Sequence, residues 1–482
     1  MSQRRRTLLK RGLAAAVVAG GAGWYVRDDL DSRFWLDPPA FDPSGIETVT
    51  DTSVPTPPRQ VPVSPAPLVE PFERRVESLL GGVPEPVPSD TLPNGAFRTR
   101  IAERRTAART ALDRAREADT TVETRDALVA AREQACEAAT VWASVNSRTP
   151  VTTVVPDRER VRTAVEAAEA ALLGPAPSPL VGARVYAALA APVETNDRVP
   201  DADRTDAHSP FEAAETARGL EQTAAHATAA RLLATRYAET VSGEPTGSVL
   251  AGTVEALGDA VVDRYRTLHR AATGGTPTPR SGGSNWSLLD SPDTDTYVDA
   301  DVPTEAPSRQ LLRDRTWPLF DRFRGPVSAP FAWAYADSDY PALVVRQTHW
   351  LLSWHAALDS LRTRIREGLR LYPADATQVR NRRQAAVDAV TRLIDDGNPL
   401  EQWVARRLCD AFEQPDDRLA GVTADTVGDD AERDGETVSR RGVAESYATY
   451  DWIVTVADAT ERATATVTEA VRRARASTDE NQ

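Results

Sequence analysis

Apolar residues recur at intervals of three or four positions through most of the chain from about residue 68 onward. Before residue 119, for example, the spacing of Phe97, Ile101, Ala108, Leu112 and Ala115 places them on one face of a helix. Alternating runs of β-branched residues bounded by turns, which predict strands, do not occur in the sequence. The pattern therefore predicts an all-α protein.

Local signals mark where several of these helices begin. Thr120 and Glu123 have the spacing of a capping box, in which each side chain accepts a hydrogen bond from the other residue's backbone N–H. Pro156 suits a first helical turn, because that turn leaves its N–H groups unpaired and proline has none. The helices expected after residue 120 cover approximately 123–146, 156–172, 178–191, 210–241, 247–272, 341–372, 375–395, 399–413 and 441–476.

The expected architecture is a multi-helix bundle in two lobes. Glycine, proline and serine are concentrated in residues 273–309, which is typical of a flexible linker between lobes. Residues 27–67 are rich in proline and lack periodicity, which predicts a stalk without a core. The expected divisions are a signal or anchor (1–26), a disordered stalk (27–67), an N-terminal bundle (68–272), a linker (273–309), a C-terminal bundle (310–476) and a disordered tail (477–482).

The first 26 residues have the layout of an export signal, because a basic head is followed by a short uncharged stretch rich in small residues. Within the head, two arginines, one free residue, two apolar residues and a lysine follow one another, and this order resembles the twin-arginine translocation motif. The resemblance implies export of a protein that folds before it crosses the membrane, and hence a cell-surface or extracellular location. The matching residues are Arg5, Arg6, Leu8, Leu9 and Lys10.

This segment has two possible fates. Small residues at 21–23 suit a cleavage site, whereas Trp24 and Tyr25, followed by Arg27, resemble an anchor at the membrane interface. The uncharged stretch spans about 22 Å as a helix, short of the ~30 Å hydrocarbon core. If it is retained, it is expected to hold the protein on the membrane as one transmembrane helix, with its N-terminus in the cytoplasm because the positive charges precede it.

Composition narrows the expected partners. The chain carries 71 acidic residues against 57 basic ones, a formal charge of −14, and Lys10 is its only lysine. An acidic, lysine-poor chain resembles proteins of halophilic archaea, although a GC-rich genome also replaces lysine with arginine. A net-negative body argues against nucleic acid as a partner, because phosphate backbones are bound by basic surfaces.

Three smaller features of the sequence each allow a functional and a structural interpretation. Cys136 and Cys409 are a candidate disulfide outside the cytoplasm, but both lie in apolar helical contexts where a free buried thiol is equally natural. Asn285 begins an Asn-Trp-Ser glycosylation acceptor pattern in the expected linker. The acidic stretches 290–301 and 423–437 lack the pattern of a calcium loop and are interpreted as solvated loops, so no metal site is expected.

Aromatic residues are concentrated between residues 317 and 355. One hypothesis makes Trp333, Trp350 and Trp354 the walls of a ligand pocket, with His355 and Asp359, one helical turn apart, as an acid–base pair. The alternative is a buried aromatic core, which we favour because tryptophan most often supplies core volume in helical domains. The helix from residue 341 supports burial, since it is apolar on every side as far as residue 358.

The sequence contains no phosphate-binding glycine loop, nucleophile elbow, dinucleotide fingerprint or haem-attachment motif. We therefore expect an exported, membrane-associated helical protein that acts by binding or scaffolding at the cell surface, with protein partners and without a cofactor. The alternative is an extracytoplasmic small-ligand-binding protein or enzyme built around the tryptophan-rich pocket.

Overall fold

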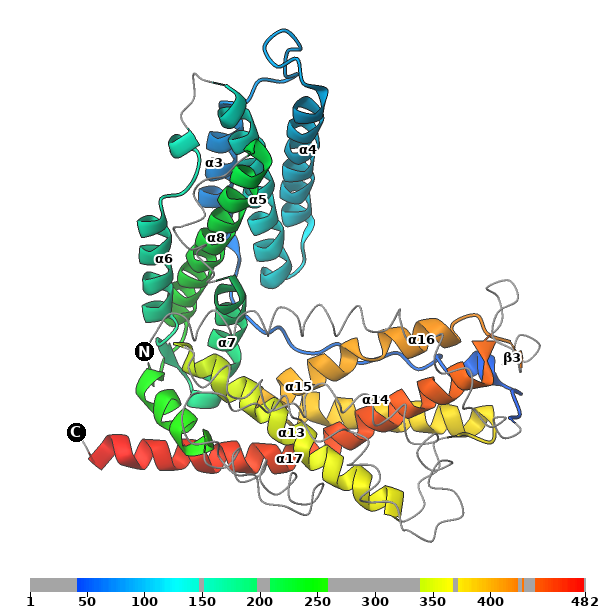
Figure 1. Ribbon diagram of the computed structural model, residues 1–482. Helices are drawn as coiled ribbons and strands as arrows, with labels where there is room; N and C mark the ends of the chain where they lie inside the picture. The colour runs from blue at the N-terminus through cyan, green and yellow to red at the C-terminus, as the bar shows by residue number, and fades with distance from the viewer. Residues whose placement is uncertain are drawn as a thin grey trace, which may run out of the picture. The chain divides into compact units, whose positions relative to one another are not determined.

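The computed structural model describes residues 41–146, 151–196, 209–258, 339–366, 372–423, 427–428 and 438–480 (Figure 1). The predicted all-α class is confirmed. Regular structure in these ranges is helical apart from two pairs of two-residue strands, β1 (Pro175–Ala176) with β2 (Glu244–Pro245) and β3 (Val427–Gly428) with β4 (Val438–Ser439).

The chain divides into two compact units, as the expected two lobes require. The N-terminal unit holds residues 59–252 with two short later pieces. Of the described residues, the C-terminal unit holds 41–58, 253–258 and those between 347 and 477. The N-terminal unit contains α3 (Ala66–Gly81), α4 (Gly95–Glu117), α5 (Thr121–Val145), η2 (Val151–Thr153), α6 (Arg158–Ala171), α7 (Pro179–Asn196) and α8 (Pro210–Thr240). The later elements are α13 (Pro341–Arg366), α14 (Ala376–Asp395), α15 (Pro399–Asp410), α16 (Glu413–Leu419) and α17 (Arg440–Glu480), and η1 (Ile46–Thr48) joins the C-terminal unit.

Helix ends follow the local signals in the sequence. The expected capping box starts α5, because Thr120 accepts a hydrogen bond from the Glu123 N–H while Glu123 accepts one from the Thr120 N–H. The helix expected at Pro156 begins two residues later, because the Asp157 side chain caps it at Arg158. Asn398 and Glu401 form a second capping box at the start of α15.

Helix α5 is the centre of the N-terminal unit, packed by α3, α4 and α8, while α6 and α7 pack on α8 (Figure 1). Five of its sixteen buried positions are alanine, among them Ala131, Ala135 and Ala138, and these small side chains let neighbouring helices approach closely. In the C-terminal unit the described side chains of α13 are buried nearly all round as far as Ala357, as its apolar sequence predicts.

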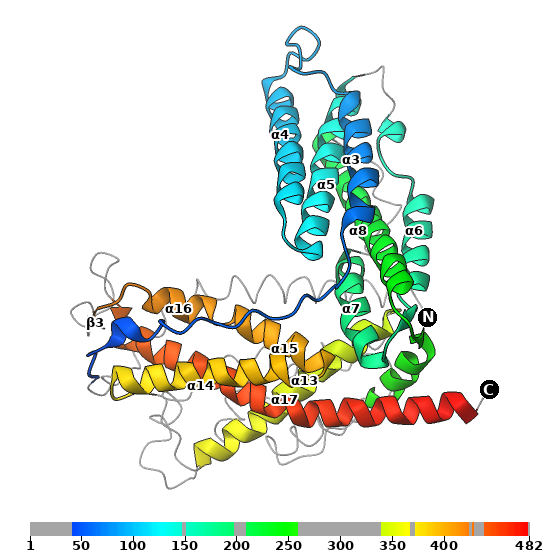
Figure 2. The same cartoon turned by 180° about the vertical axis from the view of Figure 1, so that it is seen from behind.

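The described part of the expected stalk is packed, which corrects the prediction of a segment without a core. Ile46 and Val49 are 1% and 2% exposed and belong to the core of the C-terminal unit. Backbone carbonyls of the segment accept hydrogen bonds from α14, from Arg380 to Gly45 at 3.0 Å and from Arg383 to Thr52 at 2.6 Å. Residues 41–58, the N-terminal strap, therefore run along α14–α16 as part of that unit (Figure 2).

The expectation of a membrane-held protein is also corrected. None of the helices in the described ranges combines the length and apolar character needed to cross a membrane. The export motif Arg5, Arg6, Leu8, Leu9 and Lys10, the expected linker at 273–309, Asn285 and Trp333 lie outside the described residues.

Candidate functional site

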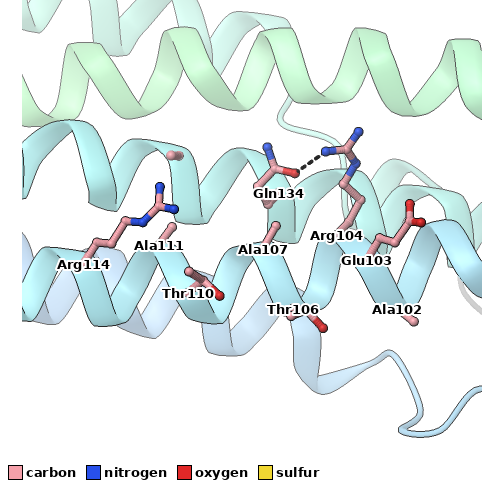
Figure 3. Close-up of a pocket in the computed structure, with 10 residues that line it drawn as sticks. Ala102, Glu103, Arg104, Thr106, Ala107, Thr110, Ala111, Arg114 and Gln134 are labelled. Atoms are coloured by element: carbon pink, nitrogen blue, oxygen red, sulfur yellow. Dashed lines mark hydrogen bonds between the residues drawn. The ribbon is translucent and has the colours of Figure 1, made fainter. Parts of the chain in front are cut away.

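A shallow groove lies between α4 and α5 in the N-terminal unit. It consists of two adjoining hollows of about 700 Å³ and about 500 Å³ that share Ala111, Arg114 and Ala130. Alanine and threonine side chains line much of it, and Figure 3 shows Thr106, Ala107 and Thr110 along the α4 side. We call this surface the α4–α5 groove.

Arg114 lines both hollows of the groove and is exposed. Within the described residues it makes no ion pair or hydrogen bond. The other arginines of α4 are committed: Arg98 to the Leu92 and Pro93 carbonyls, Arg100 and Arg104 to Glu137, Arg105 and Arg109 to Glu85, and Arg116 to Glu73. Arg114 is thus a cation on the groove wall that is available to a partner.

A polar cluster adjoins one end of the groove, where Arg104 reaches from α4 to Gln134 on α5 with a 2.8 Å hydrogen bond (Figure 3). Next to it, the Glu137 carboxylate is 4% exposed. Its Oε1 accepts from Arg100 Nε at 2.7 Å and from Arg104 Nε at 3.0 Å. Its Oε2 lies 4.0 Å from Nη1 of Arg218 on α8. Three helices therefore meet at this cluster. Helix α5 carries the buried carboxylate, and α4 and α8 supply the guanidinium groups around it.

Glu133 lies one turn before Glu137 on the same helix and is half-buried. Burial raises the pKa of Glu133 to about 7, the positive charge of Arg218 lowers it in part, and the carboxylate of Glu137 raises it further. Near neutral pH this carboxyl group therefore exists in both protonation states. The cluster of Arg100, Arg104, Glu133, Glu137 and Arg218 is called the Glu133–Glu137 cluster below.

A second ionic group lies deeper in the N-terminal unit. Glu221 on α8 accepts from Arg132 Nε at 2.7 Å and from Arg75 Nη2 at 2.9 Å. The Arg132 guanidinium also stacks over the Phe72 ring at 4.7 Å. All of these groups face one another across α3, α5 and α8, so they hold the bundle together and leave little acid–base capacity for chemistry.

The candidate disulfide concerns the two cysteines of the chain. Cys136 and Cys409 are free thiols in different units. Cys136 donates to the Ala217 carbonyl and Cys409 to the Pro55 carbonyl. Burial raises the pKa of Cys136 to about 12 and that of Cys409 to about 11, so neither thiol is reactive at neutral pH.

The candidate tryptophan pocket of the C-terminal unit is a packed aromatic cluster where the structure describes it. Trp354 contacts Trp452 at 5.5 Å and Trp350 at 5.6 Å between ring centroids, and Trp350 contacts Trp403 at 5.9 Å, all edge to face. Trp354, Trp403 and Trp452 are buried members of the hydrophobic core. Of the three candidates, Trp350 and Trp354 therefore meet in this core, and Trp333 is outside the described residues.

The candidate acid–base pair also lies on α13. His355 is 2% exposed, whereas Asp359 is half-buried. Nearby, His349 is fully buried with Nε2 2.9 Å from the Thr464 hydroxyl, and burial lowers its pKa to about 3. A histidine that resists protonation this strongly is a neutral core residue rather than a proton carrier near pH 7.

An acidic side chain of α17 completes the polar interior of the C-terminal unit. Asp451 accepts from Arg364 Nη1 at 2.9 Å and Nη2 at 2.7 Å, and Arg382 binds the same carboxylate. Again one buried acid is held by two arginines from other helices. Among the residues that the structure describes, no group of three or more His, Cys, Asp or Glu side chains is placed to hold a metal ion.

Sequence reasoning identified neither the α4–α5 groove nor the ionic groups. With 71 acidic residues, spacing along the chain cannot select which carboxylate meets which arginine. One available signal was the alternation of arginine and alanine within α4, which carries seven arginines in a net-acidic chain.

Comparison with known proteins finds two family models. Residues 68–244 match a family described as "Domain of unknown function (DUF8262)", and residues 247–469 match one described as "Domain of unknown function (DUF8264)". No curated protein and no solved structure matches the chain significantly. The two matches meet near residue 245, close to the boundary between the units at residue 252.

Proposed function

We propose that this protein is an exported binding or scaffolding protein, and that the α4–α5 groove is where it contacts a protein partner. The observation that carries the proposal is the uncommitted Arg114 above a lining of small side chains. An exposed arginine in a concave surface is a typical anchor for a carboxylate of a partner.

The lining favours a helix as the occupant. Alanine and threonine leave room for another backbone to approach at the 8–10 Å separation of packed helices. The partner helix would present small or apolar residues to Ala107, Ala111 and Ala130 and a carboxylate to Arg114. The acidic residues Glu123 and Asp126 at the far end of the groove favour a basic or neutral partner residue there.

Binding is a better account than catalysis for the described ionisable groups. Glu221 and Asp451 are each held by two arginines, and His349 is a buried neutral ring. Such groups stabilise contacts between helices and have little freedom to transfer protons.

Site-specific photo-crosslinking in cells of the source organism tests the proposal. A photoreactive residue at Thr110, on the groove, is compared with one at Thr163, an exposed threonine on the outer side of α6. We expect a defined crosslinked protein at Thr110 that is absent at Thr163, and loss of that product in Arg114→Glu. Equal products at both positions, or no product at Thr110, would refute the groove as a partner site.

Export is a separate part of the proposal and rests on the N-terminal motif. Replacing Arg5 and Arg6 with lysine is expected to retain the protein in the cytoplasm, whereas the same change at Arg4 is not, because Arg4 precedes the arginine pair of the motif. Cell fractionation with an antibody against the C-terminal unit measures both variants. Normal export of the double variant would contradict this part.

A further inference from the structure

The Glu133–Glu137 cluster has hydrogen-bonding capacity that the fold leaves unused. The Oε2 atom of Glu137 is buried and accepts no hydrogen bond within the described residues. A buried carboxylate oxygen without a donor is costly, and such a group in a native structure requires an explanation. Arg218 Nη1 is 4.0 Å from this oxygen, too far for a hydrogen bond.

The arginines around this oxygen are reachable from solvent. The side chains of Arg218 and Arg100 are 39% and 37% exposed, whereas the carboxylate beneath them is 4% exposed. Within the described residues Arg218 makes no hydrogen bond, and its one ion pair, with Glu137, is as long as 4.0 Å. Its guanidinium can therefore turn outward at the cost of that one weak contact. The cluster thus offers several N–H donors at the surface and one acceptor below them.

We propose that the Glu133–Glu137 cluster binds a protonated phosphate group, as hydrogen phosphate or as a phosphate monoester that retains one proton. The charged oxygens accept hydrogen bonds from Arg218 and Arg100, which suit phosphate because guanidinium groups form paired N–H···O bonds. The remaining P–OH donates to Glu137 Oε2 and supplies the donor that this oxygen lacks. The site goes beyond the proposed partner groove and does not depend on it.

Glu137 also explains why the site would distinguish phosphate from sulfate. Sulfate has the same shape and charge but carries no proton at neutral pH, so it would present an acceptor to the acceptor Oε2. A mismatch of this kind leaves a buried polar group unpaired and opposes binding. Selectivity for phosphate therefore follows from one buried carboxylate oxygen.

The charge balance of the cluster favours an anion. Arg100 and Arg104 from α4 and Arg218 from α8 face Glu133 and Glu137 from α5, so positive charges exceed negative ones whether or not Glu133 is ionised. Protonation of Glu133 adds one more unit of positive charge. Since the pKa of Glu133 is about 7, phosphate binding is expected to strengthen as the pH falls through neutrality.

Isothermal titration calorimetry of the full chain at constant ionic strength tests the proposal, with inorganic phosphate, phenyl phosphate and sulfate as ligands. We expect binding of inorganic phosphate and at least tenfold weaker binding of sulfate. Binding of phenyl phosphate extends the site to monoesters, and its absence restricts the site to the free anion. No binding of either phosphate, or equal binding of phosphate and sulfate, overturns the proposal.

Two variants locate the site. Arg218→Gln is expected to weaken phosphate binding about tenfold or more, the usual effect of losing a charge-assisted hydrogen bond. Its matched control is Arg236→Gln on the same helix, which removes an arginine that pairs with Glu239 at the surface. Equal affinity in Arg218→Gln and wild type would overturn the assignment, and Arg218 is exposed enough that the variant should fold normally.

A third variant tests the role of the proton. Glu133→Gln imitates the protonated side chain, so it is expected to bind phosphate several-fold more tightly than wild type at pH 8 and about equally at pH 6. Phosphate itself titrates in this range, and comparing the two proteins at each pH removes that contribution. If the ratio of the two phosphate affinities is the same at pH 6 and at pH 8, protonation of Glu133 does not control phosphate binding.

Discussion

Arg132 on α5 and Glu221 on α8 form an ion pair inside the N-terminal unit, with Nε and Oε1 2.7 Å apart and side chains only 9% and 1% exposed. Burial alone would raise the pKa of Glu221, but the charges and hydrogen bonds of Arg132 and Arg75 lower it. The carboxylate therefore stays ionised in the interior and joins three helices through two arginines.

Glu221→Gln is expected to lower the free energy of unfolding of the N-terminal unit by about 3–5 kcal/mol, because it leaves Arg132 buried without its counter-charge. The control is Glu239→Gln, which breaks a surface pair with Arg236 and should cost less than about 1 kcal/mol. Urea denaturation followed by circular dichroism measures both. Similar decreases in the free energy of unfolding in the two variants would show that the buried ion pair stabilises the unit no more than the surface pair does.

His226 on α8 is expected to make the N-terminal unit sensitive to acid. Burial, followed by the charge of Arg125, lowers its pKa from 6.5 to about 4. Between pH 6.5 and about pH 4 the unfolded chain therefore binds a proton at this side chain that the folded chain does not bind. The free energy of unfolding consequently decreases as the pH falls through this window.

Measured by urea denaturation, His226→Gln should lose less stability than wild type between pH 7 and pH 5, by about 2 kcal/mol. Glu133 acts in the opposite direction, because its raised pKa makes the folded chain hold a proton more tightly as the pH falls. The comparison is therefore between variant and wild type at each pH. Parallel pH profiles would exclude the histidine as the cause.

Substitution of Trp354 tests whether the tryptophan cluster of the C-terminal unit is a hydrophobic core or a ligand pocket. Because its ring packs between Trp350 and Trp452, Trp354→Ala is expected to destabilise that unit by about 3–5 kcal/mol, as for other large core deletions. Trp354→Phe should cost less, since it retains most of the ring volume. Unchanged stability in Trp354→Ala, measured by guanidinium denaturation, would restore the pocket hypothesis.

The two cysteines are expected to remain free and unreactive after export. In native protein neither Cys136, which is buried, nor Cys409, which is half-buried, should react readily with DTNB, because thiols with raised pKa values form little thiolate. Both should react after denaturation without a reductant. Dithiothreitol is expected to leave the melting temperature unchanged, and a decrease on reduction would show that a disulfide forms in the protein.

Sequence patterns predicted the helices well because helix formation is governed by neighbouring residues. The capping box at Thr120, the start of α8 at Pro210 and the burial of α13 all depend on spacings within a few turns. The concentration of tryptophans also identified part of the C-terminal core. Trp403 and Trp452, which complete that cluster from other helices, could not be assigned to it because their contacts are distant in sequence.

The candidate site could not be predicted, for the same physical reason. The pKa of Glu133 depends on its burial in the folded unit and on the charge of Arg218 on α8, and the unused oxygen of Glu137 depends on the position of the Arg218 guanidinium. Proline content gave no information on where Ile46 and Val49 of the N-terminal strap pack.

The N-terminal strap makes the C-terminal unit discontinuous along the chain. Arg383 binds a carbonyl that precedes it by 331 residues, so the strap is synthesised long before its binding surface on α14. Ile46 and Val49 cannot take their places in the core of the C-terminal unit until α14 has been synthesised, after residues 59–252 of the N-terminal unit. A C-terminal fragment that begins at the boundary between the two family matches, near residue 245, would lack these core residues. Docking of the strap is consequently a late event in folding, which occurs only once nearly the entire chain has been translated.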